Sequence, residues 1–294
     1  MKKLYGTGVA LVTPFDESGN IDFVALKKVL VHTARGVDYF VVMGTTGESA
    51  TCTKEEKKKV LAFIARNNPK GLPIVYGIGG NNTVSVIEEI HQTDLQQVDA
   101  LLSVSPYYNK PSQEGIYRHF SIVADASPLP IILYNVPGRT ASNLTAETIH
   151  RLAQNKNIIG VKEASGNLEQ GMKIAKEKPG TFMLISGDDL LTLPLYSIGA
   201  VGVISVLANA FPLIFRKMKQ FASSGNYAKA RKELFHLVDI NGPIYEEGNP
   251  VGVKQLMSEM GICGPHVRLP LAGASVKLAE RIKTIYQGNK KGQR

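Results

Sequence analysis

Eight short apolar runs recur along the first 206 residues, and a stretch long enough for a helix separates each run from the next. The runs span residues 6–13, 39–43, 73–77, 100–104, 130–134, 158–162, 181–186 and 201–206. Their β-branched residues and the Gly, Pro and Asn residues around them are typical of buried strands. Strands that alternate with helices form parallel sheets. The pattern therefore predicts an α/β fold, a (β/α)₈ TIM barrel, because an open doubly wound sheet usually has fewer strands and a glycine-rich first turn.

The segments between the runs have the period of a helix. Leu26, Val29 and Leu30 lie on one face of the first segment, with Lys27 and Lys28 on the opposite face. Strand signals stop after residue 211, and helical patterns follow around residues 213–222, 228–238, 251–260 and 272–286. We expect residues 1–224 to form the barrel and residues 225–294 to form a C-terminal helical domain. The polar tail over residues 287–294 is expected to fray.

The formal charge of +9 does not by itself indicate nucleic acid as a partner. Lys54 and Lys57 flank Glu55 and Glu56 on one expected helix, and such a mixture of charges is typical of a solvated surface. Aromatic residues do not alternate with basic ones, and no helix-turn-helix or zinc-finger spacing occurs. We expect no nucleic-acid partner.

The N-terminal sequence does not continue as a secretory signal, because Gly6, Gly8 and Pro14 interrupt the apolar stretch. No run approaches the roughly 18 apolar residues that cross a bilayer. Cys52 and Cys263 lack the spacing of a zinc site or a disulfide framework. The sequence predicts a cytoplasmic protein with no membrane partner.

Polar residues that directly follow the apolar runs are the candidates for catalysis, since barrel active sites lie at the carboxyl ends of strands. Lys162, Tyr134 and residues 44–48 stand at such ends. Tyr108 lies just beyond the run 100–104, and Arg139 lies just beyond Tyr134. A lysine among buried strand residues loses hydration in its charged form, which favours the neutral amine that attacks ketones. Schiff-base chemistry is the functional interpretation. Each candidate also has a structural alternative. Residues 44–47 would then form a simple turn, Tyr107 and Tyr108 would be core aromatic residues, and Lys162 would extend to water.

Several separated motifs together resemble the dihydrodipicolinate synthase and N-acetylneuraminate lyase family. They are Gly44-Thr45-Thr46-Gly47-Glu48, Tyr107-Tyr108-Asn109-Lys110-Pro111, Tyr134-Asn135-Val136-Pro137-Gly138-Arg139-Thr140, Val161-Lys162-Glu163-Ala164-Ser165-Gly166 and Gly199-Ala200-Val201-Gly202-Val203-Ile204-Ser205. The motifs occur in the family's order over nearly the whole chain, and they fall on the expected strand ends.

The resemblance implies that Lys162 forms an imine with pyruvate. The derived enamine would then attack the aldehyde of (S)-aspartate 4-semialdehyde and yield 4-hydroxy-tetrahydrodipicolinate, on the route to diaminopimelate and lysine. Tyr134, Thr45 and Tyr108 resemble the family's proton relay. Tyr108 resembles a tyrosine that reaches in from a neighbouring subunit, which implies a homotetramer built as a dimer of dimers. No metal or organic cofactor is needed.

The remaining implied contacts concern substrate binding. Thr46 resembles, with its neighbour Thr45, the group that holds the pyruvate carboxylate, and Gly187 and Ile204 resemble the pocket lining. Arg139 would bind the carboxylate of the semialdehyde, because a guanidinium donates two parallel hydrogen bonds.

Two alternatives remain open at this point. Another pyruvate-dependent aldolase of the family, acting on a sialic or sugar acid, would use the same imine, although Arg139 and the threonine pair resemble the synthase branch. A non-catalytic barrel that binds a keto acid is the alternative of a different class. The family's lysine-sensitive members commonly have histidines where Lys54 and Lys57 stand and a carboxylate where Ser85 stands, so weak or absent inhibition by lysine is expected.

Overall fold

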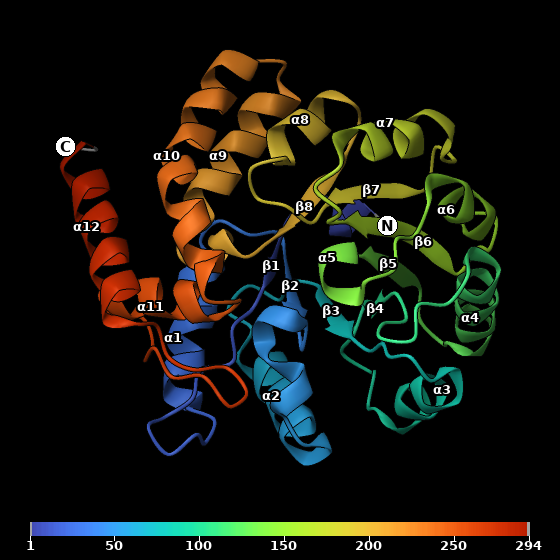
Figure 1. Cartoon of the computed structure of the whole chain (residues 1–294), viewed down its shortest axis with the longest axis horizontal. Helices are drawn as coiled ribbons and strands as arrows, with labels where there is room; N and C mark the ends of the chain where they lie inside the picture. The colour runs from blue at the N-terminus through green and yellow to red at the C-terminus, as the bar shows by residue number, and fades with distance from the viewer. Residues whose placement is uncertain (1, 293–294) are drawn as a thin grey trace. The chain divides into compact units, whose positions relative to one another are not determined.

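A computed structural model describes residues 2–292 of the chain, with side chains from residue 3 to residue 288. The eight expected strands are all present, and they pair in parallel in chain order to close a barrel. They are β1 (Gly6–Ala10), β2 (Tyr39–Val42), β3 (Ile74–Gly77), β4 (Ala100–Val104), β5 (Ile131–Asn135), β6 (Ile158–Glu163), β7 (Met183–Ser186) and β8 (Gly202–Ser205). The chain can be followed through them in Figure 1. The predicted (β/α)₈ barrel is confirmed.

The α-helices lie between and after these strands. They are α1 (Phe23–Thr33), α2 (Lys54–Asn67), α3 (Thr83–Gln92), α4 (Gln113–Ala126), α5 (Pro137–Thr140), α6 (Ala146–Leu152), α7 (Leu168–Glu177), α8 (Thr192–Ser197), α9 (Pro212–Ser223), α10 (Tyr227–Glu246), α11 (Val251–Glu259) and α12 (Val276–Gly292). None of the helices within residues 2–292 is long and apolar enough to cross a membrane.

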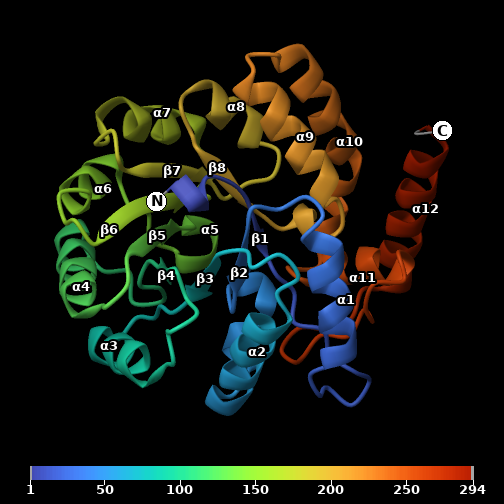
Figure 2. The same ribbon diagram turned by 180° about the vertical axis from the view of Figure 1, so that it is seen from behind.

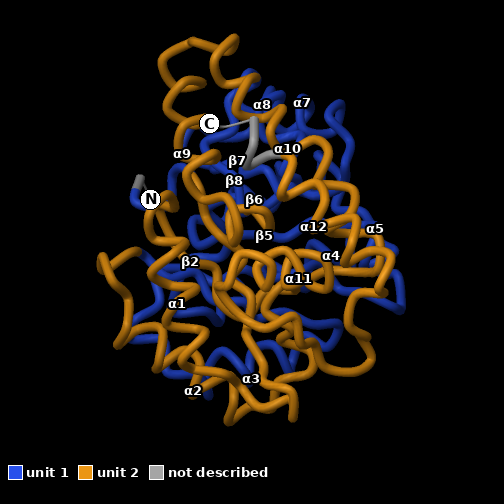
Figure 3. The backbone as a smooth tube through the Cα atoms, turned by 90° about the vertical axis from the view of Figure 1, so that its left-hand side faces the viewer, with its two compact units in different colours: residues 1–6, 73–204 blue, residues 7–72, 205–294 orange. Residues whose placement is uncertain are grey.

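The chain divides into two compact units, which Figure 3 shows in different colours. Unit 1 contains residues 1–6 and 73–204, and unit 2 contains residues 7–72 and 205–294. The predicted boundary near residue 225 divides the chain in another way, because it separates the barrel from the helices that follow it. That boundary stays a prediction.

Unit 1 covers the outer face of its strands with helices. Figures 1 and 2 both show α4, α6 and α7 outside β4–β7. The buried face of α4 includes Ile116, Phe120 and Val123, each with no exposed surface, and this spacing is the 3.6-residue period of a helix packed on a sheet. Asn82 and Thr145 accept backbone N–H bonds at the first turns of α3 and α6, which explains where these helices begin.

Unit 2 contains the C-terminal helices. The helix α10 is longer than the pattern expected around residues 228–238. It extends to Glu246 because Ile240 and Ile244, one turn apart, continue its buried face. The helix includes Pro243, a residue that usually interrupts helices. A Cβ atom added at Gly252 in α11 would lie 2.4 Å from Cα of Ile244, so a glycine is required where α11 crosses α10.

The last helix also differs from the expectation. It begins at Val276 rather than near residue 272, because the Ser275 hydroxyl accepts a hydrogen bond from Leu278 N in its first turn and the Glu247 carboxylate holds Ser275 in place. The tail that we expected to fray continues this helix as far as Gly292. Its Lys, Gln and Asn residues are compatible with a helix even though none of them is apolar. Residues 293 and 294 lie outside the described part of the chain.

A buried histidine in unit 1 makes folding depend on pH. His119 is 5% exposed, its Nδ1 lies 2.9 Å from Thr83 Oγ1, and burial lowers its pKa from 6.5 to about 4. Between these two pKa values the unfolded chain binds a proton that the folded chain does not bind, so stability is lost as the pH falls through this window.

We therefore expect His119 to lower the free energy of unfolding by about 3 kcal/mol between pH 7 and pH 4, at 1.36 kcal/mol per pKa unit. His119→Gln, which has no titratable group, should flatten the pH dependence in this range. Urea titrations at fixed pH values measure the difference. An unchanged slope in the variant would contradict the assignment.

Candidate active site

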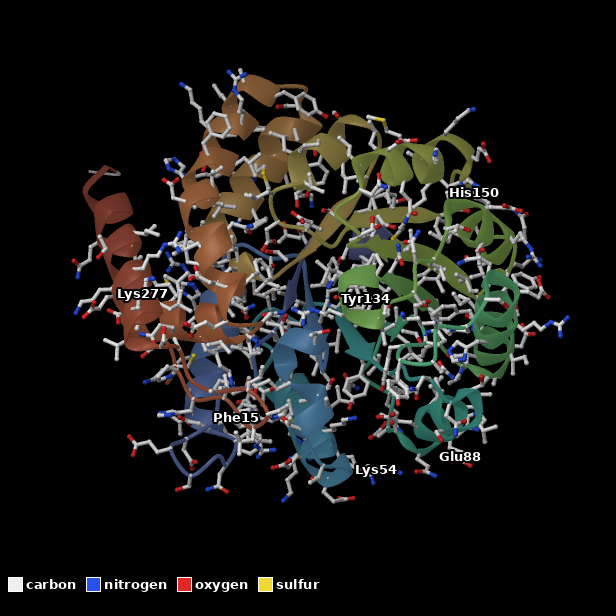
Figure 4. The ribbon with its side chains drawn as sticks, viewed as in Figure 1. Phe15, Lys54, Glu88, Tyr134, His150 and Lys277 are labelled. Atoms are coloured by element: carbon white, nitrogen blue, oxygen red, sulfur yellow. The ribbon has the colours of Figure 1, made fainter. Side chains whose placement is uncertain are left out.

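Lys162 and Tyr134 lie side by side at the carboxyl ends of two neighbouring strands. The register of β5 and β6 pairs the two residues directly, so their side chains leave the sheet on the same face. The amine Nζ of Lys162 lies 4.2 Å from the centroid of the Tyr134 ring. Both residues are buried, with exposures of 6% and 8%. Figure 4 labels Tyr134. A buried amine beside a phenol provides a nucleophile and a proton-transfer group in one place.

Gly187 leaves the space that the Lys162 side chain occupies. A Cβ atom added there would lie 2.5 Å from Cβ of Ala164 and 3.1 Å from Cε of Lys162. The Gly187 N–H donates to the Glu163 carbonyl at 2.7 Å, which holds this backbone close to β6. Gly187 and Lys162 are therefore neighbours, and the role of Gly187 in lining a substrate pocket stays a prediction.

A polar network holds the strand residues that follow Tyr134 and Lys162. Glu163 is 3% exposed, and one of its carboxylate oxygens accepts from Asn135 at 2.9 Å and from Gln170 at 2.8 Å. Its other oxygen accepts from the Ser165 N–H at 2.7 Å. Asn135 accepts in turn from the Leu144 N–H at 2.9 Å. These bonds tie the ends of β5 and β6 together and thereby hold Lys162 and Tyr134 in register.

No sequence motif had indicated a role for this network. Asn135 and Glu163 each directly follow a candidate residue, and that position was the available signal. Because successive strand residues point to opposite faces, a polar residue in that position supports the site from behind rather than lining it.

The other candidate residues of unit 1 lie near the end of β8, on the short helix α5 and on a loop. Ile204 is fully buried near the end of β8. Arg139 is exposed on α5, and it has no ion-pair partner among the residues that the structure describes. Tyr108 is 87% exposed and has a φ angle of +75°, a left-handed conformation that is costly for a bulky side chain.

The two candidate threonines belong to unit 2, in the turn Thr45–Gly47 that follows β2. Thr46 is 2% exposed, and the Thr13 hydroxyl donates to the Gly47 carbonyl at 2.7 Å. The turn ends at Glu48, which has a φ angle of +52°. Within residues 2–292, no three His, Cys, Asp or Glu side chains gather in a way that would hold a metal ion.

Comparisons with known proteins agree on one family. The model of the dihydrodipicolinate synthetase family matches residues 3–288. The chain belongs to the dihydrodipicolinate synthetase family. The relatives include a 4-hydroxy-tetrahydrodipicolinate synthase from Cytophaga hutchinsonii, which is 50% identical over 97% of this chain and 97% of its own. The family and the enzyme class predicted from the motifs, a Schiff-base-forming 4-hydroxy-tetrahydrodipicolinate synthase, are confirmed.

Solved structures of dihydrodipicolinate synthases share the fold. The structure from Thermotoga maritima superposes with a TM-score of 0.94 at 33% identity, covering 97% of this chain and 98% of that one. The chloride-inhibited enzyme from Acinetobacter baumannii, solved in complex with pyruvate, has a TM-score of 0.94 at 36% identity and covers 98% of this chain and 99% of its own.

Proposed function

We propose that this family member condenses pyruvate with (S)-aspartate 4-semialdehyde through an imine on Lys162. The close approach of the Lys162 amine to the Tyr134 ring, with space left by Gly187, is the observation that carries the proposal. The neutral amine adds to the pyruvate ketone, and loss of water leaves an imine. Loss of a methyl proton then gives an enamine, whose carbon attacks the aldehyde of the second substrate.

Proton transfers accompany most of these steps. Water leaves only when the hydroxyl of the first adduct gains a proton, and the methyl group must lose one before the carbon attacks. Tyr134 is the phenol next to the amine, so we assign these transfers to it, with Thr45 and Tyr108 as relay partners. The amine of the second substrate finally displaces Lys162 from the imine carbon, which closes the ring and frees the enzyme.

Two groups would hold the carboxylates of the substrates. Thr46, together with Thr45, would bind the carboxylate of pyruvate, and Ile204 would line the same pocket. Arg139 would bind the carboxylate of the semialdehyde, and its freedom from ion pairs within the described chain leaves the guanidinium available. This assignment favours the synthase over a sugar-acid aldolase, because a sugar aldehyde has no carboxylate for the guanidinium to bind. Weak or absent inhibition by lysine stays a prediction.

A homotetramer built as a dimer of dimers is part of the proposal. Tyr108 has an exposed ring on a strained backbone, and such a conformation persists where function requires it. A neighbouring subunit that receives this ring would account for both features. Sedimentation equilibrium measures the assembly mass, and a monomer at micromolar concentration would overturn this part. We place the enzyme in the cytoplasm, where pyruvate is made.

Borohydride reduction tests the imine directly. With pyruvate present, reduction should add one pyruvate-derived group to the wild-type protein, and peptide mapping should place that group on Lys162. Lys162→Ala should trap nothing, and its turnover should fall by at least about 10³-fold, because the covalent intermediate is lost. Lys277→Ala, which removes an exposed lysine on α12, is the matched control and should trap pyruvate normally.

Turnover with both substrates then separates the alternatives. Coupling to a purified NADPH-dependent reductase follows product formation. A wild-type protein that traps pyruvate but does not turn over the semialdehyde would point to a sugar-acid aldolase. A folded wild-type protein that never traps pyruvate would leave only the non-catalytic barrel.

A further inference from the structure

Hydrogen bonds from α11 and from the residues directly before this helix hold the turn that carries Thr46. Asn249, two residues before the helix, donates from Nδ2 to Thr46 Oγ1 at 3.0 Å. Further along α11, Lys254 donates from Nζ to Glu48 Oε1 at 2.5 Å. All of these residues belong to unit 2, and each is less than 10% exposed. Two residues of the turn are therefore held by one helical segment, across 203 and 206 residues of sequence.

The bond from Asn249 restricts the direction of the Thr46 hydroxyl. An amide nitrogen has hydrogens and no lone pair to offer, so it can only donate. Thr46 Oγ1 therefore accepts from Asn249, and the single hydroxyl hydrogen of Thr46 must point elsewhere. The hydroxyl therefore stays available to donate away from Asn249, which is the property that an anion-binding group needs.

Asn249 keeps this geometry at a cost. The residue is 8% exposed, and its oxygen Oδ1 has no hydrogen-bond partner among the described residues. A buried amide oxygen without a partner is unfavourable, and packing alone would be served better by an apolar residue. An amide at this position is better explained by the direction it gives to Thr46.

The surroundings make this arrangement rigid. Lys254 is fully buried, and it also donates to the His266 carbonyl at 2.8 Å and lies 4.2 Å from the centroid of the Phe15 ring, a residue labelled in Figure 4. Gly252 allows α11 to pack directly on the backbone of α10 at Ile244. Because α11 is packed and charge-paired on the turn, the Asn249 amide has little freedom to rotate away.

We infer that Asn249 is a positioning residue, which orients the Thr46 hydroxyl as a donor to the carboxylate of bound pyruvate. The inference rests on the proposed function, in which Thr46 holds that carboxylate. It assigns Asn249 to pyruvate affinity and not to the chemical steps on Lys162. Asn249 should not influence how the carboxylate of the second substrate is bound.

Asn249→Asp is the sharpest variant, because it keeps the shape and replaces the donor by an oxygen. The Thr46 hydroxyl must then donate to the new carboxylate, and an added negative charge faces the carboxylate of pyruvate. We expect the KM for pyruvate to rise on the order of 10- to 100-fold, the effect of losing a hydrogen bond to a charged group, while the KM for the semialdehyde and kcat at saturating pyruvate stay within about threefold. The pyruvate concentration that half-saturates borohydride trapping should rise in parallel.

A double-mutant cycle with Asn249→Ala and Thr46→Val tests the mechanism without the added charge. Each single variant should raise the KM for pyruvate, and Asn249→Ala should add less than about twofold in the Thr46→Val background, because no hydroxyl is left to orient. If Asn249 had only a structural role, Asn249→Ala would raise the KM for pyruvate by the same factor in the wild-type protein and in the Thr46→Val variant. Urea denaturation of all variants identifies any that fail to fold, and Asn249→Ala carries the test if Asn249→Asp is one of them.

The outcomes distinguish a failed role for Asn249 from a failed assignment of the reaction itself. Unchanged pyruvate half-saturation in the folded Asn249 variants, with a wild-type protein that traps pyruvate, would overturn the inference alone. Additive effects in the cycle would also overturn it. Failure of the wild-type protein to trap pyruvate would instead overturn the proposed function on which the inference rests.

Discussion

Replacing Lys254 by methionine should lower the free energy of unfolding by about 3–5 kcal/mol, because the Glu48 carboxylate would stay buried without its partner. The two side chains are 0% and 2% exposed, and Nζ lies 2.5 Å from the carboxylate oxygen. Burial lowers the pKa of Lys254, and the adjacent Glu48 carboxylate opposes that shift. Methionine retains most of the volume, so the lost charge dominates the change.

Two further variants give this prediction its controls. Lys254→Met combined with Glu48→Gln removes both charges and should recover most of the lost stability, since a neutral pair needs little compensation. Arg281→Met breaks an exposed ion pair with Glu246 and should change the free energy of unfolding by about 1 kcal/mol or less. Urea denaturation measures all three variants. A loss for Lys254→Met no larger than that for Arg281→Met would contradict the prediction.

Gly187→Ala should reduce kcat by on the order of 10²-fold, because a displacement of about 1 Å at a reacting group has an effect of that size. The added methyl group would overlap Ala164 Cβ at 2.5 Å and crowd Cε of Lys162 at 3.1 Å. The backbone at Ala164 must shift to relieve the overlap, and the lysine side chain must move away from the added methyl group. The rate of borohydride trapping at saturating pyruvate should fall together with kcat, since imine formation is the step that needs the lysine in place.

Gly180→Ala is the matched control for this change. Gly180 lies in unit 1 as well, and a Cβ atom there meets no other atom within 4 Å. Its kcat and trapping rate should equal those of the wild-type protein within about twofold, as expected for an open site on a loop. Equal rates for Gly187→Ala and Gly180→Ala would show that Gly187 does not shape the site.

The strand pattern led directly to the fold because it is a local property of the chain. Each apolar run predicts one strand, and parallel strands separated by helices have few ways to assemble. The candidate Lys162 and Tyr134 were identified for the same reason, since barrel sites lie at strand ends. The register that pairs these two residues is consistent with that reasoning.

Local patterns were less informative about the helices after β8. The helix α10 continues through Pro243 to Glu246, beyond the expected pattern, and the start of α12 depends on Ser275 and on Glu247, which is 28 residues away. Helix limits of this kind are set by capping and burial in the folded chain, which propensity alone does not describe.

Periodicity, strand ends and motif order are all read along the chain, and they were enough to predict the barrel, the family and the reactive lysine. The residues that support the site became visible only in the folded chain. The Asn249 amide meets Thr46 across 203 residues, and the Lys254 amine meets Glu48 across 206 residues. Neither contact leaves a periodic or local signal, since a hydrogen bond between distant segments depends on the path of the backbone and not on the spacing of residues within either segment.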